Sequence, residues 1–386
     1  MKYDFDTPID RRGTDSVKWD LIPDTLPMWV ADMDFAAPPK VLEALQRKLD
    51  TKIFGYQLVP DRFGEAVADW WTRRHHWKVD PGWVIYTTGV IPAITSIVKR
   101  ITNVGDNVAL MTPVYNTFYN SILNTGRHVI EAPMLYEDGE YQVDWDGLEQ
   151  VLAHPLTTMM IVCNPHNPTG HVWSTEELQR IGFLCARYDV KVLADEIHCD
   201  LTLPGVNYHP FGEVCCNPDN MITCVSVSKA FNLAGLQAAA VIVPNPALRK
   251  VIDRGLNSDE LAEPNAFAVA GMVAALTESA DWLDELREYL ADNRKAVEEF
   301  LAKELPQIHA VKQEATYLMW LDLGAIVPDT KPLCEHIRKT TGLWVIAGCQ
   351  YHGNGQRFVR LNIACPRSTL LDGLERLKKG IESYKQ

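Results

Sequence analysis

Short apolar runs alternate with helical patterns through the middle of the chain, and no other feature restricts the possible folds as strongly. The helical patterns lie near residues 93–102, 117–124 and 175–188, the last beginning with the S-x-x-E capping box of Ser174 and Glu177. Strands that alternate with helices form a parallel sheet with crossover helices. The pattern therefore predicts an α/β fold whose large domain holds a mostly parallel sheet of seven strands. The expected strands are residues 84–88, 107–111, 128–132, 158–163, 191–194, 222–225 and 239–243.

The C-terminal third of the chain predicts a second, smaller unit. A long helical pattern at residues 281–303 leads out of the sheet region. We expect a large domain of residues 45–285 and a smaller α+β domain that combines residues 1–44 with residues 286–386. The smaller domain should contain strands at residues 317–321, 343–346 and 358–361, and helices at residues 331–340 and 368–384.

Composition and charge exclude several classes of protein. The chain has 37 Lys plus Arg against 50 Asp plus Glu, a net charge of −13, so we expect neither nonspecific nucleic-acid binding nor attachment to an anionic membrane. It has no apolar run long enough for a membrane span, and its charged start does not resemble a signal peptide. Its nine cysteines follow no spaced framework, which is typical of a reduced, cytoplasmic protein. We expect no metal site, because H-E-x-x-H is absent and His75–His76 resembles a surface pair.

Charged residues directly follow two of the expected strands, at the edge where open α/β sheets build their sites. Lys229 follows strand 222–225 within Ser226-Val-Ser228-Lys229. Partial desolvation there favours its neutral, nucleophilic amine; the alternative is an exposed loop lysine. Asp195 follows strand 191–194, and a partly buried carboxylate needs a cationic partner such as a protonated pyridine nitrogen. The alternative is a surface acidic pair, with Glu196, that caps the next helix.

Three further motifs complete the set. The turn at residues 164–170 contains two Asn-Pro steps and could hold a side-chain amide toward the sheet edge, or simply lead into the next helix. Residues 87–92 place Gly89 after a strand and Pro92 at an expected first helical position, a helix N-terminus that suits phosphate. Arg360 lies in an apolar strand pattern and needs an anion. This is either a substrate carboxylate or an internal salt bridge.

Together the motifs supply a lysine, an acid, a phosphate cradle and a carboxylate-binding arginine, the requirements of a pyridoxal-phosphate site for amino acids. The chain resembles fold-type I, aspartate-aminotransferase-like pyridoxal-phosphate enzymes, and more narrowly the MalY/PatB group of cystathionine β-lyases. The resemblance covers essentially the whole chain. It is carried by LPMWVADMDF (26–35), FGYQ (54–57), NPHNPTG (164–170), DEIHCDL (195–201), SKAFNLAGLQ (228–237) and VRLNIACPRS (359–368).

The resemblance implies roles for individual residues. It implies that Lys229 binds the cofactor aldehyde covalently and that Asp195 pairs with the pyridinium nitrogen. Asn167 would hydrogen-bond the ring's phenolate oxygen and contact the substrate, whose α-carboxylate Arg360 would bind. Tyr56 would reach the phosphate of a neighbouring subunit, which implies a homodimer. Tyr115 would stack on the ring and also act as a catalytic residue. The remaining cofactor contacts would come from Gly89, Val90, His198, Ser226 and Ser228.

Two departures from the broad aminotransferase pattern bear on the reaction. His198 stands where those enzymes usually carry a tyrosine, and Gln237 stands where many have a phosphate-binding arginine. Both features resemble the C–S lyase group, so the resemblance implies α,β-elimination on cystathionine or a related S-substituted cysteine. The products would be a thiol, pyruvate and ammonia. Two alternatives stay open: an aminotransferase on the same scaffold, and a non-catalytic regulatory protein.

Overall fold

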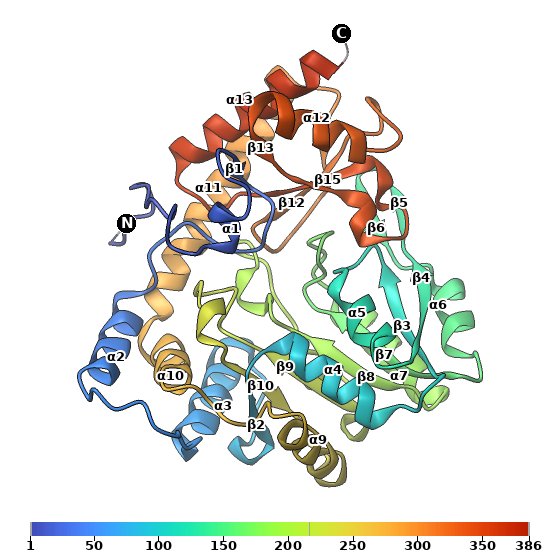
Figure 1. Ribbon diagram of the computed structural model, residues 1–386. Helices are drawn as coiled ribbons and strands as arrows, with labels where there is room; N and C mark the ends of the chain where they lie inside the picture. Colours follow the sequence, from blue (N-terminus) through green and yellow to red (C-terminus); the bar gives the residue numbers. More distant parts are fainter. Residues whose placement is uncertain (1, 216, 385–386) are drawn as a thin grey trace.

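The computed structural model describes residues 2–215 and 217–384, and its larger sheet has seven strands (Figure 1). The strand order is β2-β10-β9-β8-β7-β3-β4. β10 runs antiparallel to both of its neighbours, whereas β9, β8, β7, β3 and β4 are parallel to one another. The predicted mostly parallel sheet of seven strands is therefore confirmed. The strands are β2 Val84–Thr87, β3 Asn107–Thr112, β4 His128–Pro133, β7 Thr157–Cys163, β8 Lys191–Asp195, β9 Met221–Val225 and β10 Ala239–Ile242.

Apolar side chains project from both faces of this sheet, as expected for strands that are unbroken apolar runs. In β3, Val108 and Leu110 belong to one buried cluster, while Ala109 and Met111 belong to the other. This is the two-residue period of a strand with a helix layer on each side. The first cluster is covered by α4 Val90–Ile101, α5 Thr117–Leu123 and α9 Pro246–Ser258, and the second includes α3 Asp61–His75, α6 Trp145–Leu152, α7 Thr175–Arg187 and α10 Ala268–Glu278. The capping box of Ser174 and Glu177 is present at the start of α7.

A smaller antiparallel sheet lies beside the large one, in the upper part of Figure 1. Its order is β11-β12-β15-β14, and the predicted helix at residues 281–303 is found as α11 Ala280–Glu304. α11 crosses the expected domain limit at residue 285, and the boundaries at 44/45 and 285/286 stay a prediction. The elements are β11 His309–Ala310, β12 Leu318–Asp322, β14 Ile346–Ala347, β15 Phe358–Asn362, α12 Lys331–Thr341 and α13 Arg367–Tyr384.

The prediction of one strand at residues 343–346 is wrong, because this segment forms two short strands that pair with different partners. β13 Leu343–Trp344 pairs in parallel with β1 Leu26–Pro27 near the N-terminus. β14 pairs antiparallel with β15. One apolar run thus changes partner at Val345, which a local pattern does not reveal. The remaining elements are α1 Val17–Asp20, α2 Pro39–Leu49, α8 Phe211–Val214, β5 Leu135–Glu137 and β6 Glu140–Gln142.

Residues 28–35, which we call the N-terminal strap, run between the two sheets. Asn362 of the small sheet donates its side-chain amide to the carbonyls of Val30 (2.6 Å) and Asp32 (2.7 Å). From the large sheet's side, Asn232 accepts from the amide of Met33 (3.0 Å) and donates to the Met33 carbonyl (3.1 Å). Two asparagine side chains therefore hold the strap's backbone from opposite sides, next to the residues predicted to form the site.

Most of the described cysteines are inaccessible to solvent. Eight cysteines lie in the described part of the chain, and six of them are buried. Burial raises the pKa of the thiols of Cys163, Cys185 and Cys224. The ninth, Cys216, lies outside the described residues. Across residues 2–215 and 217–384, no helix combines the length and apolarity needed to cross a membrane.

Candidate active site

Lys229 lies in the loop that follows β9, and its side chain reaches the N-terminal strap. Its Nζ donates to the carbonyl of Ala31 at 2.7 Å. Ser226 fixes the start of the loop, since its hydroxyl donates to the Ala238 carbonyl (2.8 Å) and accepts from the Ser228 amide (3.0 Å). Burial, aided by the charge of Arg360 and opposed by that of Asp32, lowers the pKa of the Lys229 amine to about 8. The amine is therefore much more available in its neutral form than that of a surface lysine.

Asp195 ends β8 beside Cys163 of β7. Its carboxylate is 3% exposed and accepts a hydrogen bond from the amide of Ile197 at 3.1 Å. Burial raises the pKa of this carboxyl to about 7, although Lys229 acts in the opposite direction. The neighbouring Glu196 is also buried, but it accepts from the Phe211 amide (2.7 Å). The surface pair considered as an alternative is therefore wrong for both residues.

The turn after β7 brings Asn167 to Arg360. The Asn167 side-chain oxygen accepts from Nη1 of Arg360 at 3.3 Å. Gln313 supports the turn by donating to the Pro168 carbonyl at 2.9 Å. Gly170 has a φ of +66°, and a Cβ there would lie 2.7 Å from Cβ of Gln313, so glycine is required on both counts. The turn thus fixes the Asn167 amide against a residue almost two hundred positions away.

Arg360 is buried in β15 without an acidic partner. Its Nη2 donates to the carbonyl of Trp29 at 2.8 Å, and its guanidinium lies 5.0 Å from the ring centroid of Tyr351. Its Nε has no hydrogen-bond partner in the described chain. No carboxylate of residues 2–215 or 217–384 forms an ion pair with it. The internal salt bridge considered from the sequence is therefore wrong, and a buried guanidinium of this kind suits an external carboxylate.

The expected phosphate cradle lies at the start of α4. The helix begins at Val90 with Gly89 as its N-cap, so the first amides point out of the helix without intrahelical acceptors. Pro92 is the third helical residue and not the first, as the sequence suggested. The third position also lacks an intrahelical acceptor for its N–H, so proline is tolerated there as well. Ser228 lies on the same cavity wall as Val90 and adds a hydroxyl donor for an anion, whereas the Ser226 hydroxyl already donates to the Ala238 carbonyl.

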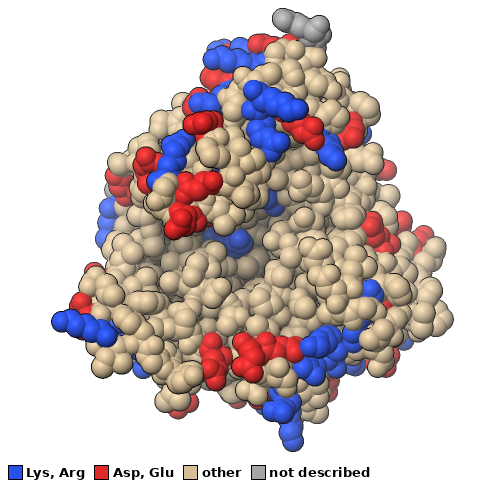
Figure 2. All heavy atoms as spheres, in the orientation of Figure 1, with Lys and Arg blue, Asp and Glu red and all other residues tan. Residues whose placement is uncertain are grey.

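A cavity of about 140 Å³ joins most of these residues. Figure 2 shows the hollow in the middle of this face, with basic side chains inside it. His198 lies on its wall, 3% exposed, with Nδ1 unpartnered in the described chain. Burial, then the charges of Lys229 and Arg360, lower the pKa of His198 to about 3, so its imidazole is neutral. The lining residues are Ala31, Val90, Ile91, Tyr115, Cys163, Asn167, Asp195, Ile197, His198, Ser228 and Lys229.

Tyr56 lies away from this cavity. Its side chain is 98% exposed, beside Leu58 at 88% and Ile53 at 74%. With Phe54 it borders a separate surface depression that also includes Gln237. One copy of the chain therefore does not bring Tyr56 to the other predicted site residues.

Three contacting residues escaped the sequence reasoning. Ala31 and Trp29 bind Lys229 and Arg360 through backbone carbonyls. Every residue has such a carbonyl, so the residue type does not indicate which one accepts a hydrogen bond. Tyr351 packs under Arg360 from a distant segment. The run LPMWVADMDF was a signal for the first two, because it contains both residues, but it gave no indication of what they contact.

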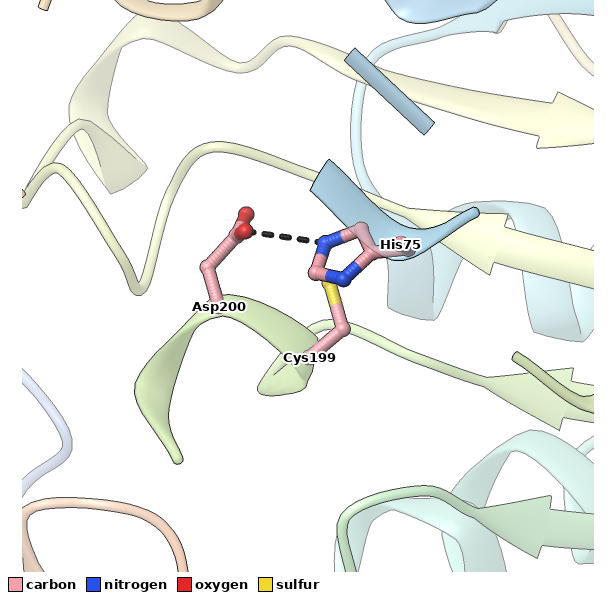
Figure 3. Close-up of side chains that lie close together, drawn as sticks. All are labelled: His75, Cys199 and Asp200. Carbon is pink, nitrogen blue, oxygen red and sulfur yellow. Dashed lines mark hydrogen bonds and ion pairs between the residues drawn. The ribbon is translucent and has the colours of Figure 1, made fainter. Parts of the chain in front are cut away.

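A second polar cluster lies outside the cavity, and it corrects the view of His75 as a surface residue. His75 is 7% exposed, and its Nε2 lies 3.0 Å from Oδ1 of Asp200, with Cys199 beside the ring (Figure 3). α3 ends at His75, and the chain turns at His76 with a φ of +59°, which leaves only His76 outside. Trp70 also donates to Asp200 (3.1 Å), and Arg74 pairs with it (3.4 Å). The carboxylate is thus already occupied by donors, as in a structural network.

Comparison with known proteins gives concordant results. The sequence pattern described as "Aminotransferase class I and II" matches residues 24–377. The chain is 41% identical to "Cystathionine beta-lyase PatB" of Bacillus subtilis (strain 168), over 98% of this chain and 99% of that one. It is 33% identical to "Protein MalY" of Escherichia coli (strain K12), over 99% and 100%. The crystal structure of cystalysin from Treponema denticola, which contains pyridoxal 5'-phosphate, superposes with a TM-score of 0.96 at 32% identity and covers both chains completely. The aspartate-aminotransferase-like fold expected from the sequence is confirmed.

Proposed function

The chain belongs to the aminotransferase class I and II family, and on that premise we propose that it is a pyridoxal-phosphate-dependent carbon–sulfur lyase. The reaction is α,β-elimination on L-cystathionine or a related S-substituted cysteine, and its products are a thiol, pyruvate and ammonia. One observation carries the proposal: Lys229, Asp195 and the Asn167–Arg360 pair, which come from four distant segments, converge on one cavity.

The residues present fit pyridoxal phosphate. The Asp195 carboxyl is buried, its pKa is raised to about 7 by that burial, and a cationic ring nitrogen would offset the cost of keeping it ionised. His198 Nδ1 is an unpartnered buried atom on the cavity wall. The amides at Gly89 and Val90, with the Ser228 hydroxyl, suit a phosphate group at a helix N-terminus, and Ser226 would support them by accepting from the Ser228 amide. Tyr115 supplies an aromatic face on the same wall.

When bound, pyridoxal phosphate supplies an electron sink for an amino acid joined to its aldehyde carbon. Lys229 would hold the cofactor at its aldehyde carbon and would give up that position to the substrate's amine. The freed Nζ, whose pKa is lowered to about 8 by burial, then accepts the proton from the substrate's Cα. Asp195 would pair with the ring nitrogen, and that cation would keep the carboxylate ionised and the nitrogen protonated. The bond from Cβ to sulfur would break, and sulfur would leave with the electron pair as a thiolate. Lys229 would then displace the unsaturated amine, which water hydrolyses to pyruvate and ammonia.

Arg360 and Asn167 orient the substrate in this scheme. The Arg360 guanidinium, which has no acidic partner in the described chain, binds the α-carboxylate. The hydrogen bond from its Nη1 to Asn167 fixes the plane of the guanidinium. The Trp29 carbonyl fixes the other amino group. With the carboxylate held, the Cα–H bond can be presented to Lys229 in one orientation, which is how positioning lowers the barrier.

An aminotransferase is the second candidate, since the family includes such enzymes by its own description. The elimination reading rests on the 41% identity with a cystathionine β-lyase over nearly the full length and on His198 and Gln237. A single experiment separates the two. Supplied with L-cystathionine and no 2-oxo acid, the pure holoenzyme is expected to form many equivalents of pyruvate per active site, measured with lactate dehydrogenase. Pyruvate limited to one equivalent, with turnover restored only by a 2-oxo acid, would establish transamination instead. No turnover under either condition would favour the non-catalytic regulatory protein.

We also propose that the chain acts as a homodimer in which Tyr56 completes the site of the second copy. The exposed apolar residues Ile53, Phe54 and Leu58 around it form a patch that a second copy would cover. Sedimentation equilibrium should give twice the mass of one chain. Mixing Lys229→Ala and Tyr56→Ala proteins, each impaired alone, should restore activity, because one of the two mixed sites would again be complete. A monomer at micromolar concentration, or mixtures no more active than their components, would contradict this arrangement.

Apart from Cys215, the described cysteines form no disulfide, which supports a reducing compartment, and we propose the cytoplasm as the location. Fractionation of the producing cells should recover the protein with the cytoplasmic markers; its recovery from an extracellular or envelope fraction would refute the proposal.

A further inference from the structure

The turn at residues 351–353 holds a histidine in a backbone conformation that is almost restricted to glycine. His352 has φ +61° and ψ −163°, a region in which a Cβ clashes with the backbone. It is flanked by the short helices Gly348–Tyr351 and Gly355–Arg357. Such a conformation persists only where the surroundings impose it, so the contacts of this turn indicate what it is held for.

The His352 side chain is fixed to helix α5 and strand β4 of the large sheet. Its ring stacks on Tyr119, with ring centroids 3.7 Å apart and planes 12° from parallel. Its Nδ1 lies 3.9 Å from Oε1 of Glu131. Tyr119 donates its hydroxyl to the same Oε1 at 2.7 Å, and Thr112 donates to Oε2 at 3.1 Å. The histidine is thus held across the gap between the small and large sheets.

The residues on either side of His352 reach the active site and the large sheet. The Tyr351 carbonyl accepts from the amide of Val114 at 2.9 Å, and Val114 directly precedes Tyr115 of the cavity wall. The Tyr351 ring is 2% exposed and lies under the guanidinium of Arg360. Gly353 packs so closely on the end of β3 that a Cβ would lie 2.8 Å from Oγ1 of Thr112. One strained turn therefore contacts both Val114, the residue before Tyr115 of the cavity wall, and the arginine proposed for the substrate carboxylate.

We propose that His352 is a positioning residue: its stack on Tyr119 holds the 351–353 turn in place, and thereby sets Tyr351 against Arg360 and the loop of Tyr115. The role of Arg360 rests on the proposed function. The contact of His352 with Tyr119 and Glu131, which we call the clasp, does not. Without the stack, the strained turn relaxes, Tyr351 shifts, and the guanidinium loses part of its fixed orientation. Carboxylate binding then weakens while the proton transfer at Lys229 is unaffected.

Two substitutions at residue 352 separate this role from ordinary packing. His352→Ala removes the ring but keeps the Cβ, so the strain remains without its anchor. His352→Gly removes the strain as well. We expect His352→Ala to raise KM for L-cystathionine about tenfold with kcat within about twofold of wild type, and His352→Gly to restore part of that loss. Tyr119→Leu should reproduce the KM effect of His352→Ala, and the double variant should add little to it.

A second readout does not depend on activity. Hydrogen exchange at the Val114 amide of the holoenzyme should be about tenfold faster in His352→Ala than in wild type, with His352→Gly between them. His336→Ala is the matched control, since His336 packs edge-on against Tyr384 on the C-terminal helix, with ring centroids 5.2 Å apart. It should leave KM and Val114 exchange unchanged.

The proposal fails if His352→Ala matches wild type in Val114 exchange, or if His352→Gly is as impaired as His352→Ala. If the wild-type enzyme does not turn over cystathionine at all, the proposed function fails, and the exchange measurement still decides whether the clasp exists. Should His352→Ala not fold, Tyr119→Leu tests the same contact from the other side.

Discussion

Replacing Lys229 with alanine is expected to lower the rate of elimination by about 10⁴-fold or more, the upper range for loss of a positioned base that also forms a covalent link. The reason is positional, because no second amine takes the place of Nζ beside Asn167 and Asp195 on the described cavity wall. Pyruvate formation from L-cystathionine measures the effect. Borohydride reduction followed by peptide mass spectrometry should fix a pyridoxyl group at residue 229 in wild type and none there in the variant.

Lys295→Ala is the matched control for this change. Lys295 lies on α11, and its side chain is 73% exposed, so its loss should leave activity within error of wild type. Circular dichroism should show that Lys229→Ala keeps the fold, since the hydrogen bond lost from Nζ is a single one, to the Ala31 carbonyl. Ordinary pyruvate formation by Lys229→Ala would overturn the assignment of the base.

Asp195→Asn is expected to reduce the rate of elimination by about 10²–10³-fold, the range measured when one preorganised electrostatic contact is removed. Asparagine has nearly the same volume and keeps the acceptor for the Ile197 amide. It cannot carry the negative charge that keeps a ring nitrogen protonated. Cofactor affinity should fall as well, and equilibrium dialysis of pyridoxal phosphate would measure it alongside kcat.

Glu196→Gln provides the comparison, because Glu196 is the adjacent buried carboxyl and its pKa is also raised to about 7 by burial. It contacts the Phe211 amide and Asn164, and glutamine retains an acceptor for the former. We expect a rate within about threefold of wild type. Equal losses in the two variants would mean that the effect reflects burial of a carboxyl in general, and the specific role of Asp195 would be lost.

Much of the fold could be predicted from the sequence because its signals are local. Each of the seven strands of the large sheet is an apolar run with its own turn residues, and each was found within one or two residues of its expected limits. Lys229, Asp195 and Asn167 could be brought together in advance for a related reason. Each lies at or after the carboxyl end of one of the parallel strands β7, β8 and β9, and the carboxyl ends of such strands share an edge.

What escaped prediction depends on partners that are distant in sequence. The change of partner at Val345 is decided by β1, more than 300 residues away. The Ala31 carbonyl binds Lys229 across 198 positions, and neither residue type indicates the other. His75 looked like half of an exposed pair because the αL turn at His76, which separates the two rings, is not encoded in a pair of identical residues. For Tyr56, a single chain does not contain the predicted contact.

The sheltered cysteines have a consequence for a lyase of this kind. Every turnover would release a small nucleophilic sulfur compound beside its own catalyst, and disulfide substrates would add an oxidant. Mixed disulfides form through thiolates that solvent can reach. With six of eight described cysteines buried and several of their pKa values raised, the protein offers a disulfide substrate few thiolates to exchange with, even at Cys163 on the cavity wall.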